Sequence, residues 1–255
     1  MAAEDVIAAD TSDWIAVLPL GAHEQHGPHL PFETDTIIAS GIACRLADAL
    51  GEDLPVTFLP AEPVGYSIEH MDYKGSKTLA FDQAVNKWTG IGEELASQGI
   101  RKMLLLNAHG GNSPLMTIVA TELRVRCNML CVATSWTRFI EAGKTIMAAE
   151  KAFGIHGGDL ETSVMLALAP DTVDMEKAEN FHSFQQDLSQ SAKHLRAYGP
   201  HAFGWKIQDL NVKGVTGNAS IATAEKGEAF LSEAVEGLKQ LIADMNAFDL
   251  AHFEG

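Results

Sequence analysis

The chain has 255 residues, of which 46% are hydrophobic, so it is long enough to bury a sizeable core. Its 34 acidic and 18 basic residues give a formal charge of −16, which would repel nucleic acid. The sequence has neither an apolar run of about 18 residues nor a signal-peptide pattern in residues 1–13. We therefore expect a cytoplasmic protein without nucleic-acid or membrane partners, in which Cys44, Cys127 and Cys131 are reduced.

Short apolar runs alternate with helical patterns through the first half of the chain. Strands are predicted at residues 14–20, 56–59, 103–106 and 129–133. Helices are predicted at residues 36–50, 82–98 and 113–126, where apolar side chains recur every three or four residues. This alternation is typical of βαβ units, and it predicts a three-layer α/β/α fold with a mostly parallel sheet.

The second half of the chain is less regular. Helices are predicted at residues 159–168 and 225–246, with a polar stretch at 182–197 and a glycine-rich loop at 199–219 between them. No internal repeat or linker divides the sequence. We therefore expect one domain over residues 1–255.

Polar, histidine-bearing loops follow two of the predicted strands. One loop covers residues 21–35 after the first strand, and the other covers residues 107–112 after the third. Ligands of open α/β sheets bind outside the carboxyl ends of the strands. The two loops should therefore lie at the same edge of the sheet.

The first loop gathers several side chains that can bind metal. Glu24 and His26 are two residues apart, and Asp35 lies at the start of the next helix. Carboxylates and imidazoles together suit Zn, Mn or Fe rather than Ca or Mg. The alternative is that Asp35 or Thr34 caps the helix while His26 and His29 bind loop carbonyls.

Two further segments carry isolated metal-ligand types between glycines. The segment N-A-H-G-G-N at 107–112 contains His109. A tight turn with Asn112 or Ser113 as helix cap would explain its glycines but not its histidine. The segment H-G-G-D-L-E-T-S at 156–163 places Glu161 in the first turn of a helix. The helix dipole alone also favours a carboxylate there, so both interpretations of Glu161 remain open.

Taken together, the three segments resemble the creatininase, or creatinine amidohydrolase, family. The matching patterns are G-x-x-E-Q-H-G-P-H-L-P-x-x-T-D, N-x-H-G-G-N and H-G-G-D-x-E-T-S, in this order and at similar intervals. Weaker matches are Glu69-His70 with Gly75 and Thr78, and G-V-T-G at 214–217 followed by A-T-A-E-K-G at 222–227. The resemblance extends from about residue 14 to about residue 230.

The resemblance implies a site for two divalent ions (Zn, Mn or Fe) in which Asp35 bridges the metals. The implied ligands are Glu24, His26, Asp35, His109 and Glu161. Creatininase itself takes a glutamate two residues after the histidine that matches His109, whereas this chain has Gly111 there. Glu161 is therefore expected to supply the missing carboxylate, and the substrate is expected to differ from creatinine.

The function implied by the resemblance is hydrolysis of a non-peptide or cyclic C–N amide by metal-bound hydroxide. His156 is expected to protonate the departing nitrogen, with Glu161 as a second catalytic group; the alternative for His156 is a bond to the backbone at the helix start. Substrate contacts are expected from Tyr66, Ser67, His70, Trp136 and Trp205. The resemblance also implies a homohexamer acting on a small amide or lactam.

The sequence lacks the patterns of several other protein classes. No G-x-S-x-G or Cys–His pattern indicates a serine or cysteine hydrolase, and no G-x-G-x-x-G or Walker lysine follows a strand. A non-catalytic metal-binding or assembly protein on the same fold, or a peptidase-type relative acting on a small peptide, remain as alternatives.

Overall fold

The protein is described by a computed structural model over residues 11–51 and 54–253. Residues 1–10, which include most of the segment tested for a signal peptide, lie outside the described residues. The central sheet contains β1 (Ile15–Leu20), β2 (Val56–Phe58), β3 (Lys102–Asn107) and β4 (Leu130–Ser135). All neighbouring strands are parallel and their order is β2-β1-β3-β4, which confirms the predicted parallel sheet.

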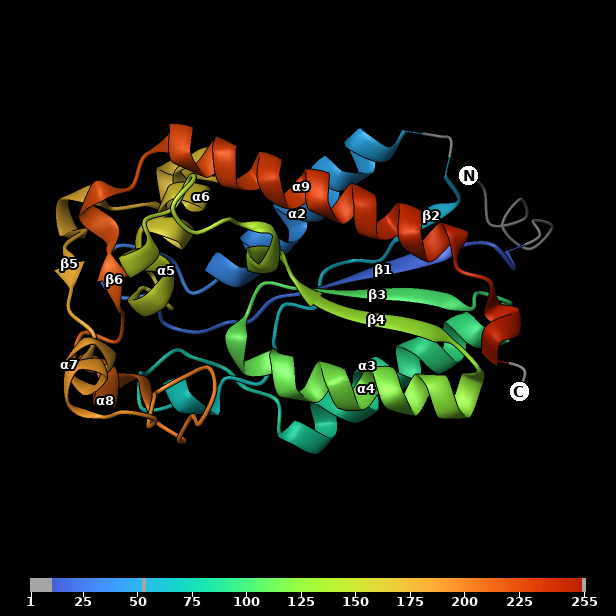
Figure 1. Cartoon of the computed structure of the whole chain (residues 1–255), viewed down its shortest axis with the longest axis horizontal. Helices are drawn as coiled ribbons and strands as arrows, with labels where there is room; N and C mark the ends of the chain where they lie inside the picture. The colour runs from blue at the N-terminus through green and yellow to red at the C-terminus, as the bar shows by residue number, and fades with distance from the viewer. Residues whose placement is uncertain (1–10, 52–53, 254–255) are drawn as a thin grey trace.

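Helices cover both faces of this sheet (Figure 1). One face is covered by α3 (Phe81–Ser97) and α4 (Ser113–Cys127), and the other by α2 (Thr34–Leu50) and α9 (Ala224–Ala247). The helix α6 (Asp159–Leu168) packs against α2 and α9. The three predicted layers are therefore present, and each predicted strand and helix of the first half is found within a few residues of its expected bounds.

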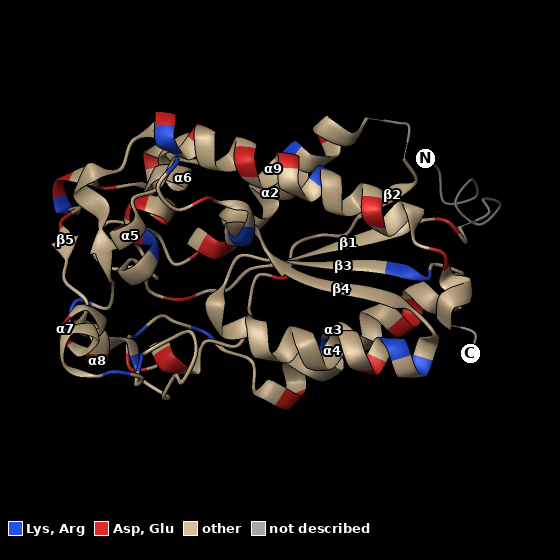
Figure 2. Cartoon of the chain, viewed as in Figure 1, with Lys and Arg blue, Asp and Glu red and all other residues tan. Residues whose placement is uncertain are grey.

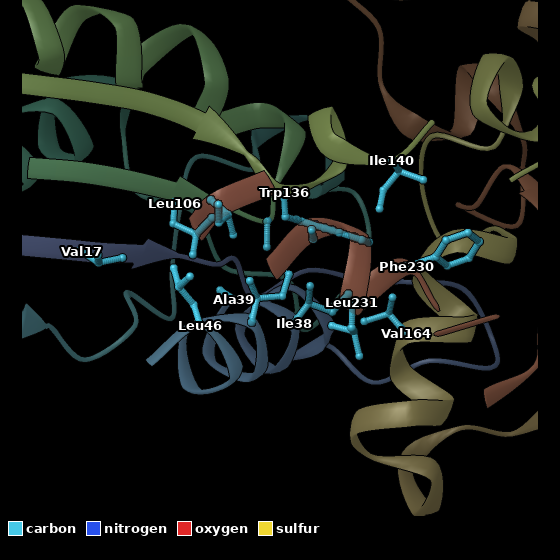
Figure 3. Close-up of a cluster of buried hydrophobic side chains, with 14 of the residues drawn as sticks. Val17, Ile38, Ala39, Leu46, Leu106, Trp136, Ile140, Val164, Phe230 and Leu231 are labelled. Carbon is cyan, nitrogen blue, oxygen red and sulfur yellow. The ribbon is translucent and has the colours of Figure 1, made fainter. Parts of the chain in front are cut away.

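The strands are apolar on both faces because both faces are covered. Ile15 and Val17 of β1 belong to the core on the α2 and α9 side, whereas Ala16, Leu18 and Leu20 belong to the core on the α3 and α4 side. Figure 3 shows part of the first core, in which side chains of β1 and β3 meet those of α2, α6 and α9. Because both faces of each strand are buried, the strand sequences are continuous apolar runs.

Small elements that the sequence did not predict lie beyond the carboxyl ends of the strands (Figure 1). They are α5 (Ala148–Phe153), α7 (Phe184–Ser191), α8 (Ile207–Leu210) and the antiparallel pair β5 (Asn180–Phe181) and β6 (Gly217–Asn218). The polar stretch at 182–197 is thus partly helical, because Ser183 caps α7 by accepting a hydrogen bond from the Gln185 N–H. The predicted glycine-rich loop at 199–219 likewise contains α8 and β6.

Charged side chains of both signs occur along the helices of both outer layers (Figure 2). In the described ranges, no helix is long and apolar enough to cross a membrane. Cys44, Cys127 and Cys131 are all free, as expected for reduced thiols.

Close packing of α9 on α6 gives a first testable prediction. A Cβ atom on Gly227 of α9 would lie 2.0 Å from the backbone oxygen of Ser163 in α6, whereas a Cβ on Gly90 of α3 would meet nothing within 4 Å. We expect Gly227→Ala to lower the free energy of unfolding by about 1–3 kcal/mol through overpacking. The matched control Gly90→Ala should raise it by up to about 1 kcal/mol, because alanine is the better helix former. Urea unfolding of both variants measures this, and equal stability of the two would contradict the packing described.

Candidate metal centre

The two histidine-bearing loops leave neighbouring strands at the same edge of the sheet. Leu20 at the end of β1 pairs in register with Asn107 at the end of β3. Glu24 and His109 follow these strand ends and meet, with Glu24 Oε1 3.2 Å from His109 Nδ1. The strand order therefore places the two loops together, as the sequence predicted.

His109 and Glu24 form one half of the site with Asp35. His109 Nδ1 lies 3.6 Å from Asp35 Oδ2, and the opposite ring nitrogen, Nε2, donates to the Tyr66 carbonyl at 2.9 Å. This backbone bond fixes the ring so that Nδ1 faces the two carboxylates. Atoms of Glu24, Asp35 and His109 all lie within 4.8 Å of one another, close enough to hold one metal ion.

His26 and Glu161 lie on the other side of Asp35. His26 Nε2 is 3.4 Å from Asp35 Oδ1 and 3.8 Å from Glu161 Oε2. His26 Nδ1 donates to the Glu24 carbonyl at 3.0 Å, which turns Nε2 toward the carboxylates. Glu161 lies in the first turn of α6 and accepts a bond of 2.6 Å from the Gly157 N–H. The two oxygens of Asp35 thus face two different histidines.

Asp35 does not cap α2. It lies in the first turn, and the residue at the N-cap position, Glu33, makes no capping side-chain bond. The Thr34 hydroxyl donates to the Pro31 carbonyl at 2.7 Å. The capping alternative raised by the sequence is therefore not what these side chains do.

Several ligand atoms at this centre are buried and make no hydrogen bond within the described part of the chain. They are both carboxylate oxygens of Glu24, Asp35 Oδ2 and His26 Nε2. Buried polar atoms are almost always hydrogen-bonded, and an unpaired buried charge costs several kcal/mol. Two carboxylates and an imidazole with free lone pairs are the donor set of a divalent ion such as Zn, Mn or Fe. The residues present therefore fit a bound metal.

His70 and His156 surround the other side of Glu24. His70 Nδ1 accepts from the Gln25 amide at 3.2 Å, and its Nε2 lies 3.3 Å from Glu24 Oε1. The Gln25 amide is oriented because its oxygen accepts from the Gly27 N–H at 2.9 Å. His156 Nε2 donates to the Gln25 carbonyl at 2.8 Å, which leaves Nδ1 facing Glu24 Oε1 at 3.6 Å.

The late G-V-T-G segment holds these loops together. Gly27 and Gly157 both have positive φ, and a Cβ on either would lie 2.7 or 2.6 Å from Val215 Cγ1. Val215 is fully buried between them, and the next residue, Thr216, donates its N–H to the His156 carbonyl at 2.8 Å. The glycines of the first and third segments are thus required for close approach to Val215.

Asn112 connects three loops rather than capping α4. Its side-chain oxygen accepts from the Tyr66 N–H at 2.9 Å, and its amide donates to the Gly21 carbonyl and to Asn107 Oδ1, both at 3.1 Å. The side chain is fully buried and makes no capping bond. Asn112 therefore fixes the loop that carries His109 against the loop that carries Glu24.

Gly111 makes room for a second carboxylate, Glu69. A Cβ on Gly111 would lie 2.8 Å from Glu69 Oε1 and 2.3 Å from the Tyr66 carbonyl. Glu69 Oε1 is 3.8 Å from His109 Nε2. The carboxylate nearest to Gly111 thus comes from Glu69, whereas Glu161 approaches the site from the His26 side.

Opposite charges control the titration of the two proposed histidine ligands. Burial alone lowers the pKa of His26, but Asp35, Glu161 and Glu24 together outweigh it and raise that pKa to about 9. Burial likewise lowers the pKa of His109, and Glu24, Asp35 and Glu69 together raise that pKa to about 10. Burial raises the pKa of Glu24, but His109 and His70 hold it well below its usual value. Without metal, protonated imidazoles therefore balance the carboxylates.

The two proposed catalytic groups titrate differently. Burial raises the pKa of the Glu161 carboxyl to about 7, despite the opposing effect of His26. Burial, together with His26 and His70, lowers the pKa of His156 well below its usual value. His156 is therefore neutral at pH 7, with its Nδ1 lone pair facing the site.

The side chains singled out in the sequence lie in different places. Glu24, His26, Asp35, His109 and Glu161 converge, and His156 lies in contact with them. Tyr66 and Ser67 lie against His109 Nε2, His70 lies against Glu24, and Trp136 lines a neighbouring cavity. Trp205 instead donates to the Ala197 carbonyl at 2.7 Å and packs with Ile207 in a separate small core.

Sequence reasoning missed four groups of this centre: Gln25, Asn107, Glu69 and Asn112 as a connecting residue. Gln25, Asn107 and Asn112 lie inside the recognised segments, so their position was a signal that could have been used. Glu69 was noticed only as part of a weak pattern. Its approach to Gly111 depends on the path of two loops, which the sequence does not specify.

Comparison with known proteins agrees with this arrangement. A sequence model of the creatininase family, described as creatinine amidohydrolase, matches residues 1–242. The chain is 28% identical over 250 residues to creatinine amidohydrolase of Pseudomonas putida, covering 91% of this chain and 90% of that protein. It is 27% identical over 235 residues to the mycofactocin precursor peptide peptidase of Mycolicibacterium smegmatis, covering 88% and 82%.

The fold leads to the same family. A crystal structure of creatinine amidohydrolase (creatininase) superposes with a TM-score of 0.78 at 25% identity, covering 98% of this chain and 97% of the other. The fold and the cluster of carboxylates and imidazoles define a metal-binding α/β protein of the hydrolase type. The chain belongs to the creatininase family.

The shifted pKa values predict how the metal-free protein responds to pH. The folded pKa values of His26 and His109, about 9 and 10, lie above the ordinary value of 6.5. Their contribution to stability is therefore complete below pH 6.5 and is lost as pH rises through 9 and 10. The raised pKa of Glu161, about 7, likewise makes the folded protein less stable as pH rises, but over a lower pH range.

We expect the melting temperature of the chelator-treated protein to fall by about 5 °C or more between pH 6.5 and 9.5. Protein loaded with Zn²⁺ serves as the control, because its histidines would be unprotonated throughout. Circular dichroism melts of both forms provide the comparison. If the melting temperature changed equally with pH in both forms, these histidines would carry no such charge.

Proposed function

We propose that the protein hydrolyses a C–N amide bond of a small molecule with two divalent metal ions. Glu24, Asp35 and His109 would hold one ion, and His26, Asp35 and Glu161 the other. The observation that carries this proposal is the set of buried ligand atoms of Glu24, Asp35 and His26 that make no hydrogen bond within the described residues. A divalent ion would occupy the lone pairs that the surrounding imidazoles leave without a hydrogen bond.

Asp35 is the proposed bridging ligand. Its Oδ1 faces His26 at 3.4 Å and its Oδ2 faces His109 at 3.6 Å, so one carboxylate reaches both halves of the site. Two divalent ions bring four positive charges, which the three carboxylates and one hydroxide balance. Mixed carboxylate and imidazole ligands suit Zn, Mn or Fe.

When bound, such ions lower the pKa of a coordinated water to about 7 and polarise a carbonyl oxygen. The residues of this chain supply the proton transfers. His156 is neutral, and its Nε2–H is held by the Gln25 carbonyl, so that Nδ1 is free to accept a proton and to pass it to the departing nitrogen. Glu161, with a pKa near 7, is a second group able to hold a proton at the site.

The substrate is proposed to be small. A cavity of ≈ 290 Å³ adjoins the site and is lined by both His109 and Glu161. Ligand cavities are commonly about 300–1,000 Å³, so this one suits a molecule of few atoms. A short peptide is the alternative substrate, since one relative is a precursor-peptide peptidase. The non-catalytic alternative, the homohexamer and the cytoplasmic location stay predictions.

Metal analysis combined with hydrolysis assays tests the proposed function. The purified protein should contain Zn, Mn or Fe and should hydrolyse members of a panel of formamides, cyclic amides and short peptides. Chelation should abolish this activity, and the same metal should restore it, because the proposed nucleophile is a metal-bound hydroxide. Full activity of the metal-free protein would contradict the proposal, and so would metal-loaded protein inert toward the whole panel.

Glu161→Gln separates the two metal positions. The substitution keeps the size of the side chain but removes a charged ligand, so the ion shared with His26 should bind much more weakly while the ion at Glu24 and His109 stays. Metal analysis should then fall from two ions per subunit to about one, and turnover by at least about 100-fold. Glu69→Gln is the matched control, because Glu69 lies 3.8 Å from His109 Nε2 but is not among the side chains whose ligand atoms lie close enough together to hold a metal ion.

Two ions per subunit with near-normal turnover in Glu161→Gln would reduce Glu161 to a carboxylate at a helix N-terminus. A loss of metal in Glu69→Gln equal to that in Glu161→Gln would instead assign a ligand role to Glu69.

A further inference from the structure

The cavity beside the metal centre is lined by polar groups that the proposed chemistry does not use. His109 and Glu161 form its side toward the metal centre. Ser113, Ser135, Trp136, Lys151 and Tyr198 line its other parts. A substrate whose amide lies at the metal centre would place its remaining atoms in this cavity. The chemistry of these side chains therefore bears on the substrate class.

Asn107 lies beside two serine hydroxyl groups at the edge of this cavity. Its side-chain oxygen accepts from the His109 N–H at 3.1 Å, which fixes the amide orientation. The Asn107 Nδ2 donates one proton to the His109 carbonyl at 2.5 Å, and its second proton is shared between Ser113 Oγ at 3.3 Å and Ser135 Oγ at 3.2 Å. Each serine oxygen is thus approached by a donor, and none of the hydrogen bonds described for the chain uses either hydroxyl proton. Both protons are available to an acceptor in the cavity.

Trp136 adds a third donor without a partner. Its side chain is 1% exposed, and its Nε1 makes no hydrogen bond within the described residues. An indole nitrogen can only donate, so a buried one needs an acceptor. Trp136 lines the cavity, and an acceptor bound there is the available partner.

Lys151 supplies the positive charge. Among the residues that line the cavity, it is the only lysine or arginine in the described part of the chain. Its Nζ donates to the Ile140 carbonyl, which is itself part of the cavity wall. The Tyr198 hydroxyl donates to the Ala152 carbonyl and lies 3.1 Å from the Lys151 carbonyl, so it holds this part of the backbone.

Glu150 fixes the helix that carries Lys151. It is buried and accepts from the Asp159 N–H at 2.8 Å and from the Asn218 N–H at 3.0 Å. A Cβ on Gly154, Gly158 or Gly217 would lie within 2.4 Å of Glu150 Oε1, so these three residues leave the space it fills. Since Asp159 begins α6, which also carries Glu161, α5 is attached to the element that shapes the metal centre.

We infer that this cavity binds a carboxylate on the substrate, at the end remote from the cleaved amide. The inference rests on the proposed amide hydrolysis. Ser113, Ser135, Trp136 and Lys151, which carry two hydroxyl protons, one indole N–H and one ammonium group, all line this space. Among the described residues its only acidic lining side chain, Glu161, belongs to the metal centre. Only acceptors satisfy such donors, and the single positive charge matches a monoanion rather than a phosphate dianion.

The test uses carbonyl compounds that cannot be hydrolysed, so that binding is measured apart from turnover. The probe is 4-oxopentanoate, and its neutral counterpart is 5-hydroxy-2-pentanone. Calorimetry on the metal-loaded protein should give a dissociation constant at least about ten-fold lower for the carboxylate. Lys151→Met should remove this preference, Lys151→Arg should keep most of it, and affinity for the alcohol should change less than about two-fold.

Lys144→Met is the matched control. Lys144 is exposed, lies in the same part of the chain and pairs with Glu141 at 3.9 Å, but it does not line this cavity. Its loss changes the net charge equally and should leave the preference intact. Unchanged carboxylate affinity in Lys151→Met, an equal loss in Lys144→Met, or tighter binding of acetonylphosphonate than of 4-oxopentanoate would overturn the inference.

The outcome of the binding test is distinguishable from the outcome of the test of the proposed function. A carboxylate preference that depends on Lys151 in a protein inert toward every amide would remove the amidase proposal and keep the anion site. Amidase activity with no effect of Lys151 on carboxylate binding would do the reverse.

Discussion

Carboxylates crowd around two imidazoles at the buried end of a parallel sheet, and the rest of the structure accommodates this arrangement. Glu24 and Asp35 are at most 1% exposed, and neither forms an ion pair with a lysine or arginine among the described residues. Burying such charges costs several kcal/mol each unless compensating charges surround them. In the described structure His26 and His109 are the nearest compensating groups, and their raised pKa values express the same attraction. A metal pair would take over the role of the protons.

The fold brings these side chains together through strand ends, backbone carbonyl groups and glycines. Neighbouring strands β1 and β3 end side by side and deliver two loops to one place. Backbone carbonyls of Glu24, Tyr66 and Gln25 each hold one nitrogen of an imidazole, so the other nitrogen faces the centre. Glycines let Val215 and Glu69 approach to distances that a Cβ would prevent. The site is therefore oriented by main-chain groups, which substitutions alter least.

Much of this was accessible from the sequence, because the decisive residues lie in short local patterns. Hydrophobic periodicity and turn residues predicted the strands, and the parallel topology predicted that their loops lie together. The three sequence segments contain the five candidate ligands. Other contacts were not accessible, because they join residues far apart in the chain. Gln25 reaches the Gly214 carbonyl across 189 positions. The helix α7 is a different case, because its capping box of Ser183 and Gln186 is a local pattern inside a polar stretch without a clear apolar period. Lys151 has no local signal at all, since only the folded chain brings α5 to the cavity.

The central claim is that Asp35 bridges two metal ions, and metal-edge anomalous scattering from crystals of the metal-loaded protein tests it most directly. The account predicts two anomalous peaks about 3.5–4 Å apart. One peak should lie between Asp35, Glu24 and His109, and the other between Asp35, His26 and Glu161. A single peak, or a second peak that touches neither oxygen of Asp35, would contradict the dinuclear site.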